Sequence, residues 1–178
     1  MDSVNVPVPG QVEAVAAEVA ADLTAGQGGL AGFDRPGAAD FRVRQHRTLV
    51  AKRLSDGDPH RVERRAREAL SGTPPFEVRV DRVEQFAEPT SGSGPVVYLA
   101  VESPGLRRLH ARLCDALGTV EGLEAEDYTP HVTVARGGTA EAAERVLGPV
   151  DPVEWTVSEL QLWDATRKLV AARISLPA

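Results

Sequence analysis

Two of the four histidines in this sequence are each followed, two positions later, by a threonine. His46 and Thr48 lie in the stretch "HRTL", and His131 and Thr133 lie in the stretch "HVTV". In a β-strand, residues i and i+2 point to the same face, so each histidine should project together with its threonine. We therefore expect two polar forks, each made of one imidazole and one hydroxyl.

Two imidazoles that face each other across a cleft suit displacement at phosphorus, because one can remove a proton while the other donates one. Threonine hydroxyls can donate hydrogen bonds to the non-bridging oxygens, where negative charge builds up in the transition state. This chemistry requires no metal, and neither motif carries an acidic partner at metal-ligand spacing. No "GxxxxGK[ST]" loop is present for ATP. We expect no metal and no cofactor.

The residues between and after the motif positions should face the core. In the second motif these are Val132 and Val134, which fits a strand with one buried face. In the first motif Arg47 occupies the equivalent position, where an apolar residue is expected. The first strand therefore either lies at an edge or has an irregular register there.

Four further residues are candidates for substrate contacts. Arg44 shares a predicted face with His46 and can steer an anion. Arg136 follows the second motif, but strict alternation turns it away from His131 unless the strand bulges. Tyr128 and Trp163 can stack on a base, although core packing is an equal reading for both.

The other two histidines have simpler explanations. His60 falls in the first turn of a charged helix, where we expect it to be solvated. His110 flanks a leucine stripe on another helix, and we expect it to pack at the rim of that stripe. The alternative for the two motif histidines is that they are partly buried strand residues with satisfied hydrogen bonds and no catalytic role.

The hydrophobic pattern predicts strands and helices in mixed order. Antiparallel hairpins with interspersed helices indicate an α+β fold rather than a parallel doubly wound sheet. A loop rich in Gly, Ala, Pro and Asp should cover residues 25–40, and a shorter loop should follow residue 86. The expected strands are 3–9, 41–54, 75–86, 94–103, 153–164 and 168–176, and the expected helices are 11–23, 60–70, 104–117 and 139–147.

Composition narrows the class of protein. The 178 residues fit one domain spanning 1–178, and no apolar run reaches the roughly 20 residues of a membrane span. The net charge of −6 argues against binding to duplex DNA. The single cysteine, Cys114, and the absence of a signal-like N-terminus favour a cytoplasmic protein, and we expect a monomer. Only Lys52 and Lys168 are lysines, so phosphate contacts should come from arginine.

The paired motifs, together with "YTPHVTVAR" at residues 128–136, resemble the 2H phosphoesterases, in the branch of the 2′-5′ RNA ligases and RNA 2′,3′-cyclic phosphodiesterases. The resemblance extends over most of the chain. It implies a bilobal fold of two antiparallel sheets with flanking helices, related by a pseudo-two-fold axis, with the active-site cleft between the lobes. The segment "LVAKRLSDGD" after Thr48 departs from the family, which usually has an aromatic residue there.

The resemblance also implies roles for the four motif residues. His46 would donate a proton to the leaving ribose oxygen, and His131 would accept one from the attacking water. Thr48 and Thr133 would hold the phosphate. The implied reaction is hydrolysis of an RNA 2′,3′-cyclic phosphate end to a 2′-phosphate, with 2′-5′ ligation as related reverse chemistry.

Two alternatives remain open at this stage. The same chemistry suits a small cyclic phosphodiester, such as a cyclic nucleotide or an ADP-ribose cyclic phosphate. The fold also suits a non-catalytic module that binds the phosphate of an RNA 3′ end. Intact histidines argue against the binding module, because binding alone does not need their proton chemistry.

Overall fold

The computed structural model describes residues 2–25, 40–54 and 58–177. Most of the predicted loop 25–40 lies outside these residues. None of the helices in the described ranges is long and apolar enough to cross a membrane. The elements are β1 (Ser3–Val6), α1 (Gly10–Ala25), β2 (Arg42–Val43), β3 (Leu49–Arg53), α2 (Pro59–Leu70), β4 (Phe76–Phe86), β5 (Val96–Glu102), α3 (Pro104–Leu117), η1 (Ala125–Asp127), β6 (His131–Arg136), α4 (Ala140–Glu144), β7 (Gly148–Val157), β8 (Glu159–Asp164) and β9 (Leu169–Ser175).

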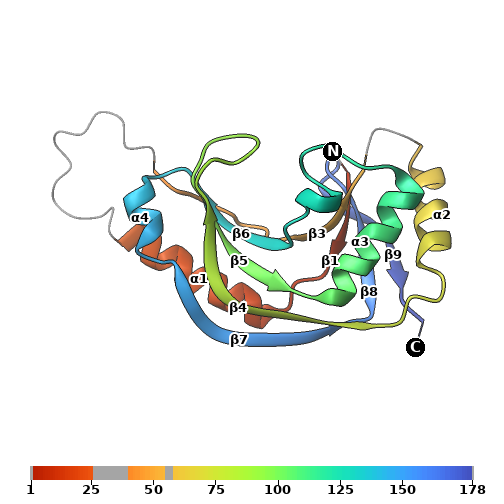
Figure 1. Ribbon diagram of the computed structural model, residues 1–178, viewed down its shortest axis with the longest axis horizontal. Helices are drawn as coiled ribbons and strands as arrows, with labels where there is room; N and C mark the ends of the chain where they lie inside the picture. Colours follow the sequence, from red (N-terminus) through yellow and green to blue (C-terminus); the bar gives the residue numbers. More distant parts are fainter. Residues whose placement is uncertain (1, 26–39, 55–57, 178) are drawn as a thin grey trace.

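The strands of the described residues form one antiparallel sheet in the order β7-β4-β5-β6-β3-β1-β8-β9, with β2 paired to β6. The two halves of this sheet meet where β6 lies beside β3, through a single residue pair, Leu49 with Val132. Figure 1 shows α1 and α4 beside one half and α2 and α3 beside the other. The expected α+β fold with two lobes is confirmed, and the Leu49–Val132 pair joins its two sheets into one.

The helices cover the sheet through small and branched apolar side chains. Helix α3 buries the predicted leucine stripe at Leu106, Leu109 and Leu113 with no exposed surface. Helix α1 buries Val12, Ala16, Val19, Ala20 and Leu23. Each fully buried leucine or valine contributes about 1.5–3 kcal/mol relative to an exposed one, so these faces hold the helices against the sheet.

Local sequence signals set the starts of α2 and α3. The Asp58 side chain accepts a hydrogen bond from the backbone N–H of His60 (3.1 Å). The Ser103 hydroxyl accepts one from the backbone N–H of Leu106 (3.0 Å) and donates one to the Glu77 carbonyl (2.6 Å). Both caps precede a proline at the first helical position, which is the expected pattern for a helix N-terminus.

Two segments that were predicted as continuous strands are each divided into two strands. The segment 41–54 divides into β2 and β3, because residues 45 and 46 form a bend and the next strand begins only at Leu49. The segment 153–164 divides at Ser158, because β7 pairs with β4 in one half of the sheet and β8 pairs with β1 in the other. Two elements are also shorter than expected, since β1 ends at Val6 and α4 covers only Ala140–Glu144.

Candidate active site

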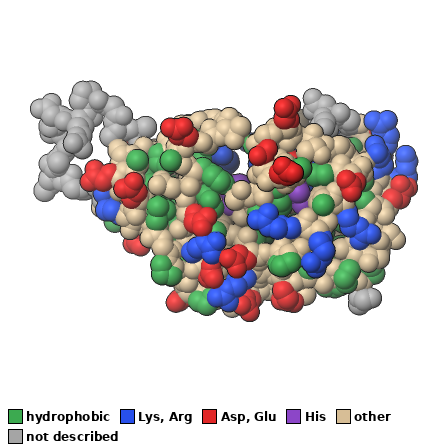
Figure 2. All heavy atoms as spheres, viewed as in Figure 1, with side chains coloured by type: hydrophobic (Ala, Val, Ile, Leu, Met, Phe, Trp, Pro, Cys, Tyr) green, Lys and Arg blue, Asp and Glu red, His purple; other side chains and the backbone are tan. Residues whose placement is uncertain are grey.

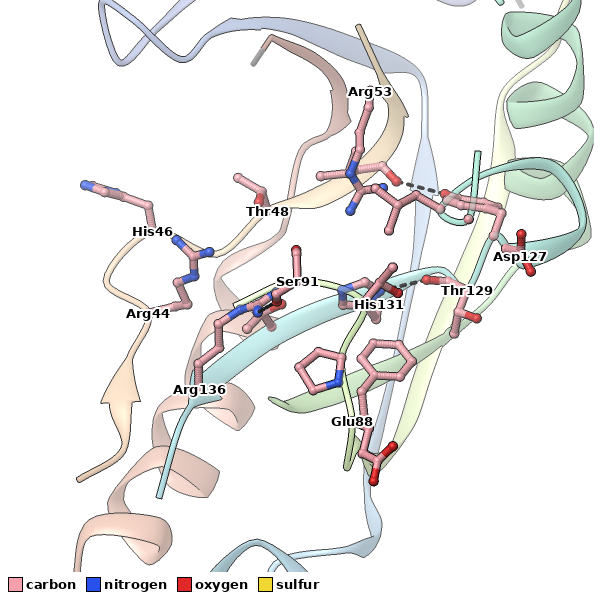
Figure 3. Close-up of a pocket in the computed structure, with 18 residues that line it drawn as sticks. Arg44, His46, Thr48, Arg53, Glu88, Ser91, Asp127, Thr129, His131 and Arg136 are labelled. Atoms are coloured by element: carbon pink, nitrogen blue, oxygen red, sulfur yellow. Dashed lines mark hydrogen bonds between the residues drawn. The ribbon is translucent and has the colours of Figure 1, made fainter. Parts of the chain in front are cut away.

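A cavity of about 290 Å³ lies between the two halves of the sheet, and both His-x-Thr pairs line it (Figure 3). Figure 2 shows histidine side chains in the hollowed middle of this face. The walls come from the segment between β2 and β3, from β3 and β6, from the end of β4 with the β4–β5 loop, and from the segment around η1. Beyond the motif residues, the lining consists of Arg44, Val50, Arg53, Phe86, Glu88, Pro89, Thr90, Ser91, Gly122, Leu123, Asp127, Tyr128, Thr129 and Arg136.

The second motif lies in strand β6, which has partners on both sides. His131 pairs with Ala100 of β5, and Val132 pairs with Leu49 of β3. Val132 is fully buried, as the alternation predicts. The strand therefore holds His131 and Thr133 on the cavity side.

A β-bulge brings Arg136 into the same cavity. Thr133 pairs with Tyr98 and Ala135 pairs with Val97, which leaves Val134 without an opposite residue on β5. The extra residue reverses the alternation, so Arg136 returns to the face that carries His131. Its Nη1 donates a hydrogen bond to the Ser91 carbonyl (2.9 Å).

The ring of His131 is held in one tautomer. Its Nδ1 lies 2.7 Å from the carbonyl oxygen of Thr129, and a carbonyl only accepts, so Nδ1 carries the proton. Nε2 then keeps a free lone pair. Burial lowers the pKa of His131, and the positive charges of Arg53 and Arg136 lower it further. A neutral imidazole with a free ring nitrogen is the form that a general base requires.

Two aromatic rings support His131. Phe86 meets the imidazole edge-on, with ring centroids 5.1 Å apart, and Tyr98 lies at 5.2 Å. Phe86 and Tyr98 stack on each other at 4.3 Å. Phe86 lines the cavity, and sequence reasoning missed it. Its place at the end of a predicted strand, directly before a loop, was the available signal.

The first motif is built differently. His46 lies in the bend between β2 and β3 and is exposed to solvent. In Figure 3 its ring points away from His131. The expectation that His46 and Thr48 share one strand face was therefore wrong, because the strand begins only at Leu49. Arg47 explains the break. Its side chain, only 10% exposed, lies on the core side and is paired with Glu13 of α1 at 2.8 Å.

Arg53 is a cavity residue that the sequence reasoning did not single out. In the pairing of β1 with β3, Val4 lies opposite Lys52 and Asn5 lies opposite Val50, so Ala51 forms a second bulge. Beyond this bulge Arg53 lies on the cavity side with Val50. Arg44, which was predicted from its place before His46, also lines the cavity. The basic pair in "AKRL" after Thr48 was the only sequence signal for Arg53.

Lys52 points away from the cavity and forms a buried ion pair. Its Nζ lies 2.6 Å from Oε2 of Glu124, and both side chains are almost completely buried. Glu124 also accepts hydrogen bonds from the backbone N–H groups of Arg53 (2.7 Å) and Val120 (2.9 Å). Burial alone would raise the pKa of Glu124, but these donors hold it below its usual value.

Tyr128 forms part of the cavity wall and is itself buried. Its ring stacks on His110 at a centroid distance of 3.7 Å, and its hydroxyl donates to the Val50 carbonyl (2.9 Å). Burial raises the pKa of Tyr128. Because His110 already covers one face of this ring, Tyr128 has at most its other face for a base. Trp163 is not among the cavity residues.

The rim position expected for His110 was wrong. The side chain is buried, with 3% exposure. Its Nδ1 donates to the Ala51 carbonyl (2.7 Å), and its Nε2 accepts from the backbone N–H of Ala125 (3.0 Å). Burial lowers its pKa. His60 is exposed, as expected. In the described ranges no group of three or more His, Cys, Asp or Glu residues is placed to hold a metal ion.

Comparisons with known proteins support the family and the fold. The family model of the 2′-5′ RNA ligase superfamily matches residues 9–169. A crystal structure of TT0787 of Thermus thermophilus is 20% identical with a TM-score of 0.61, covering 98% of this chain and 97% of that one. E. coli LigT complexed with 3′-AMP is 19% identical with a TM-score of 0.57, covering 99% and 98%. E. coli LigT complexed with phosphate is 20% identical with a TM-score of 0.52, covering 99% and 97%. No curated protein sequence matches the chain.

These solved structures share the fold over nearly the whole chain, and the family match covers both His-x-Thr motifs. The chain belongs to the 2′-5′ RNA ligase superfamily.

Proposed function

We propose that the protein is a metal-independent phosphodiesterase that hydrolyses RNA 2′,3′-cyclic phosphate ends to 2′-phosphates. The observation that carries this proposal is the pairing of two His-Thr sets around one cavity, with the Nε2 lone pair of His131 left free. Membership in a superfamily of phosphoesterases and RNA ligases supports the reaction class.

His131 is the general base of the proposed reaction. The hydrogen bond from Nδ1 to the Thr129 carbonyl fixes the ring, so Nε2 can accept a proton from a water molecule in the cavity. That water oxygen forms the new bond to phosphorus. The lowered pKa keeps His131 neutral at neutral pH, which is the protonation state that the step consumes.

His46 is the general acid. As the bond from phosphorus to the ribose 3′ oxygen breaks, the protonated imidazole donates a proton to that oxygen and leaves a free 3′ hydroxyl. Because His46 is exposed and its ring points outward in Figure 3, the side chain must rotate towards the cavity to act. A surface side chain changes rotamer within nanoseconds, so this rotation does not limit turnover.

The phosphate is held by hydroxyls and guanidinium groups. Thr48 and Thr133 donate hydrogen bonds to the non-bridging oxygens, and Arg44 and Arg136 balance the charge that develops on them. Arg136 lines the cavity and pairs with no carboxylate in the described chain, so its positive charge is available to an incoming anion. With a 5′ hydroxyl in place of water as the nucleophile, the same groups would form a bond from that oxygen to phosphorus while the 3′ oxygen leaves, which gives a 2′-5′ linkage.

The size of the cavity suits a terminal nucleotide. About 290 Å³ lies at the lower end of the range for small-molecule sites, so the enclosed part of the substrate is small while the rest of an RNA chain extends into solvent. The crystal structure of E. coli LigT with 3′-AMP holds a nucleotide in that protein, which fits this size class. The hydrolysis of a small cyclic nucleotide is the alternative that the same volume permits.

A direct test uses a short RNA that ends in a 2′,3′-cyclic phosphate, incubated in EDTA with the wild type and with His46→Ala or His131→Ala. Phosphorus NMR identifies the product. We expect a 2′-phosphate from the wild type and a loss of roughly 10²- to 10⁴-fold in each variant, as removal of a general acid or base predicts.

His60→Ala provides the matched control, because His60 is exposed and does not line the cavity. It should retain the wild-type rate. The absence of turnover by the wild type, or turnover that survives both motif substitutions, would contradict the proposal.

A further inference from the structure

The cavity holds more cationic groups than one phosphodiester needs. Arg44, Arg53 and Arg136 all line it, and none of the three pairs with a carboxylate in the described part of the chain. Glu88 and Asp127 also line the cavity, but both are exposed and neither lies within ion-pair distance of these arginines. A 2′,3′-cyclic phosphate carries a single negative charge, so it leaves part of this cationic set unmatched.

The three arginines divide into two groups around the catalytic residues. In Figure 3, Arg44 and Arg136 lie on one side of the cavity, whereas Arg53 reaches in from β3 on the opposite side. The charges of Arg53 and Arg136 both act on His131, which therefore lies within reach of the two groups. The first group comes from the two motif segments, since Arg136 belongs to β6 and Arg44 precedes His46, so it serves the scissile phosphate. Apart from its effect on the pKa of His131, Arg53 has no assigned role in that reaction.

Arg53 stands on a rigid support. Its backbone N–H donates to Oε1 of Glu124 (2.7 Å), and its carbonyl accepts from Nζ of Lys52 (2.5 Å). Both partners belong to the same buried ion pair. The ion pair thus fixes the main chain of Arg53 on both sides, which reduces the entropy lost when the side chain binds an anion.

We propose that Arg53 binds a second phosphate, the one attached to the 5′ oxygen of the nucleotide whose 2′,3′-cyclic phosphate is hydrolysed. In a nucleotide chain this is the next anionic group after the cyclic phosphate, so one substrate can occupy both cationic groups. Arg53 therefore makes the enzyme prefer ends with a 5′ phosphate over a bare nucleoside cyclic phosphate. This inference rests on the proposed function, because it assigns the substrate class of the same site.

A set of three substrates tests the preference. These are adenosine 2′,3′-cyclic phosphate, the same compound with a 5′ phosphate, and an adenosine dinucleotide with a 2′,3′-cyclic end. We expect kcat/KM of the wild type to be roughly tenfold or more higher for the two substrates with a second phosphate, the size of effect of a charge-assisted hydrogen bond.

Arg53→Gln should reduce that ratio to near one, while Arg53→Lys should retain part of it because the charge remains. Arg65→Gln is the control, since Arg65 is an exposed arginine of α2 outside the cavity, and it should keep the wild-type ratio. An equal kcat/KM for all three substrates in the wild type, or an unchanged ratio in Arg53→Gln, overturns the proposal. A higher kcat/KM for the dinucleotide alone would overturn the proposal too, because a 5′ phosphate by itself would then not be recognised.

A binding measurement separates this inference from the proposed reaction. Calorimetry with adenosine 2′-phosphate and adenosine 2′,5′-bisphosphate should show tighter binding of the bisphosphate by roughly tenfold or more, and Arg53→Gln should abolish the difference. If none of the substrates is hydrolysed but this difference holds, the hydrolysis is wrong and the second phosphate site stands. If hydrolysis occurs without any difference in binding, the site is wrong and the reaction stands.

Discussion

The two His-x-Thr motifs share a pattern but not a local structure. His131 lies within β6, with β5 on one side and β3 on the other, and its ring is fixed by a hydrogen bond to Thr129. His46 lies in a bend, exposed, and in Figure 3 it points away from the centre of the cavity. The same pair of residue types therefore lies on one face of a strand in the second motif and in an exposed bend in the first.

The difference comes from the residue between histidine and threonine. In the second motif this residue is Val132, which is fully buried and continues the strand. In the first motif it is Arg47, whose charge needs a partner on the core side and finds it in Glu13 of α1. The main chain around Arg47 leaves the sheet to make this contact, so Thr48 comes before the start of β3.

The comparison also suggests a division of roles. A general base benefits from a fixed ring, a defined tautomer and a lowered pKa, all of which His131 has. A general acid must reach the leaving oxygen, and an exposed side chain is free to rotate towards it. The exposed place of His46 fits that second role.

The largest expected effect comes from removing the support of the first motif. Strand β3 follows Thr48 and is anchored by the buried pair of Lys52 with Glu124. Glu124→Ala leaves the Lys52 charge buried without its partner, so we expect a loss of about 3–5 kcal/mol in the free energy of unfolding, measured in urea. The nearby exposed Glu126→Ala should change it by less than about 0.5 kcal/mol. A cost below about 1 kcal/mol for Glu124→Ala would show that the pair does not anchor β3.

A smaller effect concerns the pH dependence of the second motif. The base must be unprotonated, so kcat/KM should fall as the pH drops through the pKa of His131, which burial places below its usual 6.5. Arg136→Gln removes one of the charges that lower this pKa, so the acid limb should move to higher pH. NMR titration of the His131 ring proton, assigned by its loss in His131→Ala, provides an independent value. A His131 pKa at or above 6.5 would be inconsistent with the burial seen here.

The smallest effect should come from making the first motif resemble the second. Arg47→Val removes a nearly buried charge and restores the apolar alternation, so the change in stability should stay within about 1 kcal/mol. Hydrogen exchange should show increased protection of the amides of residues 45–48. Glu13→Gln is the matched variant, since it leaves the Arg47 charge in place and should destabilise by about 1 kcal/mol. Unchanged exchange in Arg47→Val would mean that Arg47 is not the cause of the bend.

Much of the fold followed from local sequence signals. The caps at Asp58 and Ser103, the leucine stripe of α3 and the alternation in β4 all depend on residues close in sequence, so they could be predicted. The forked arrangement of His131 and Thr133 followed from the same alternation, since β6 is a strand with one buried face.

The features that the sequence did not reveal depend on partner strands. The bulges at Ala51 and Val134 are set by the registers of β1 and β5, which no local pattern encodes. A bulge decides which face of the sheet the following residues occupy. The position of Arg53 in the cavity could therefore not be predicted, and that of Arg136 depended on whether β6 contains a bulge. The break at Ser158 has a similar origin, since β7 and β8 pair with strands in different halves of the sheet.

The division between base and acid can be measured most directly with a leaving group that needs no proton. A 3′-deoxynucleoside 2′-(4-nitrophenyl phosphate) carries nitrophenolate in place of the leaving ribose 3′ oxygen and releases it as an anion at neutral pH, so its hydrolysis requires a base but no acid. We predict that His131→Ala loses roughly a hundredfold or more on both this ester and the cyclic phosphate. His46→Ala should lose as much on the cyclic phosphate and less than about tenfold on the ester. Equal losses for His46→Ala on both substrates, or the reverse pattern, would contradict the assignment of His131 as base and His46 as acid.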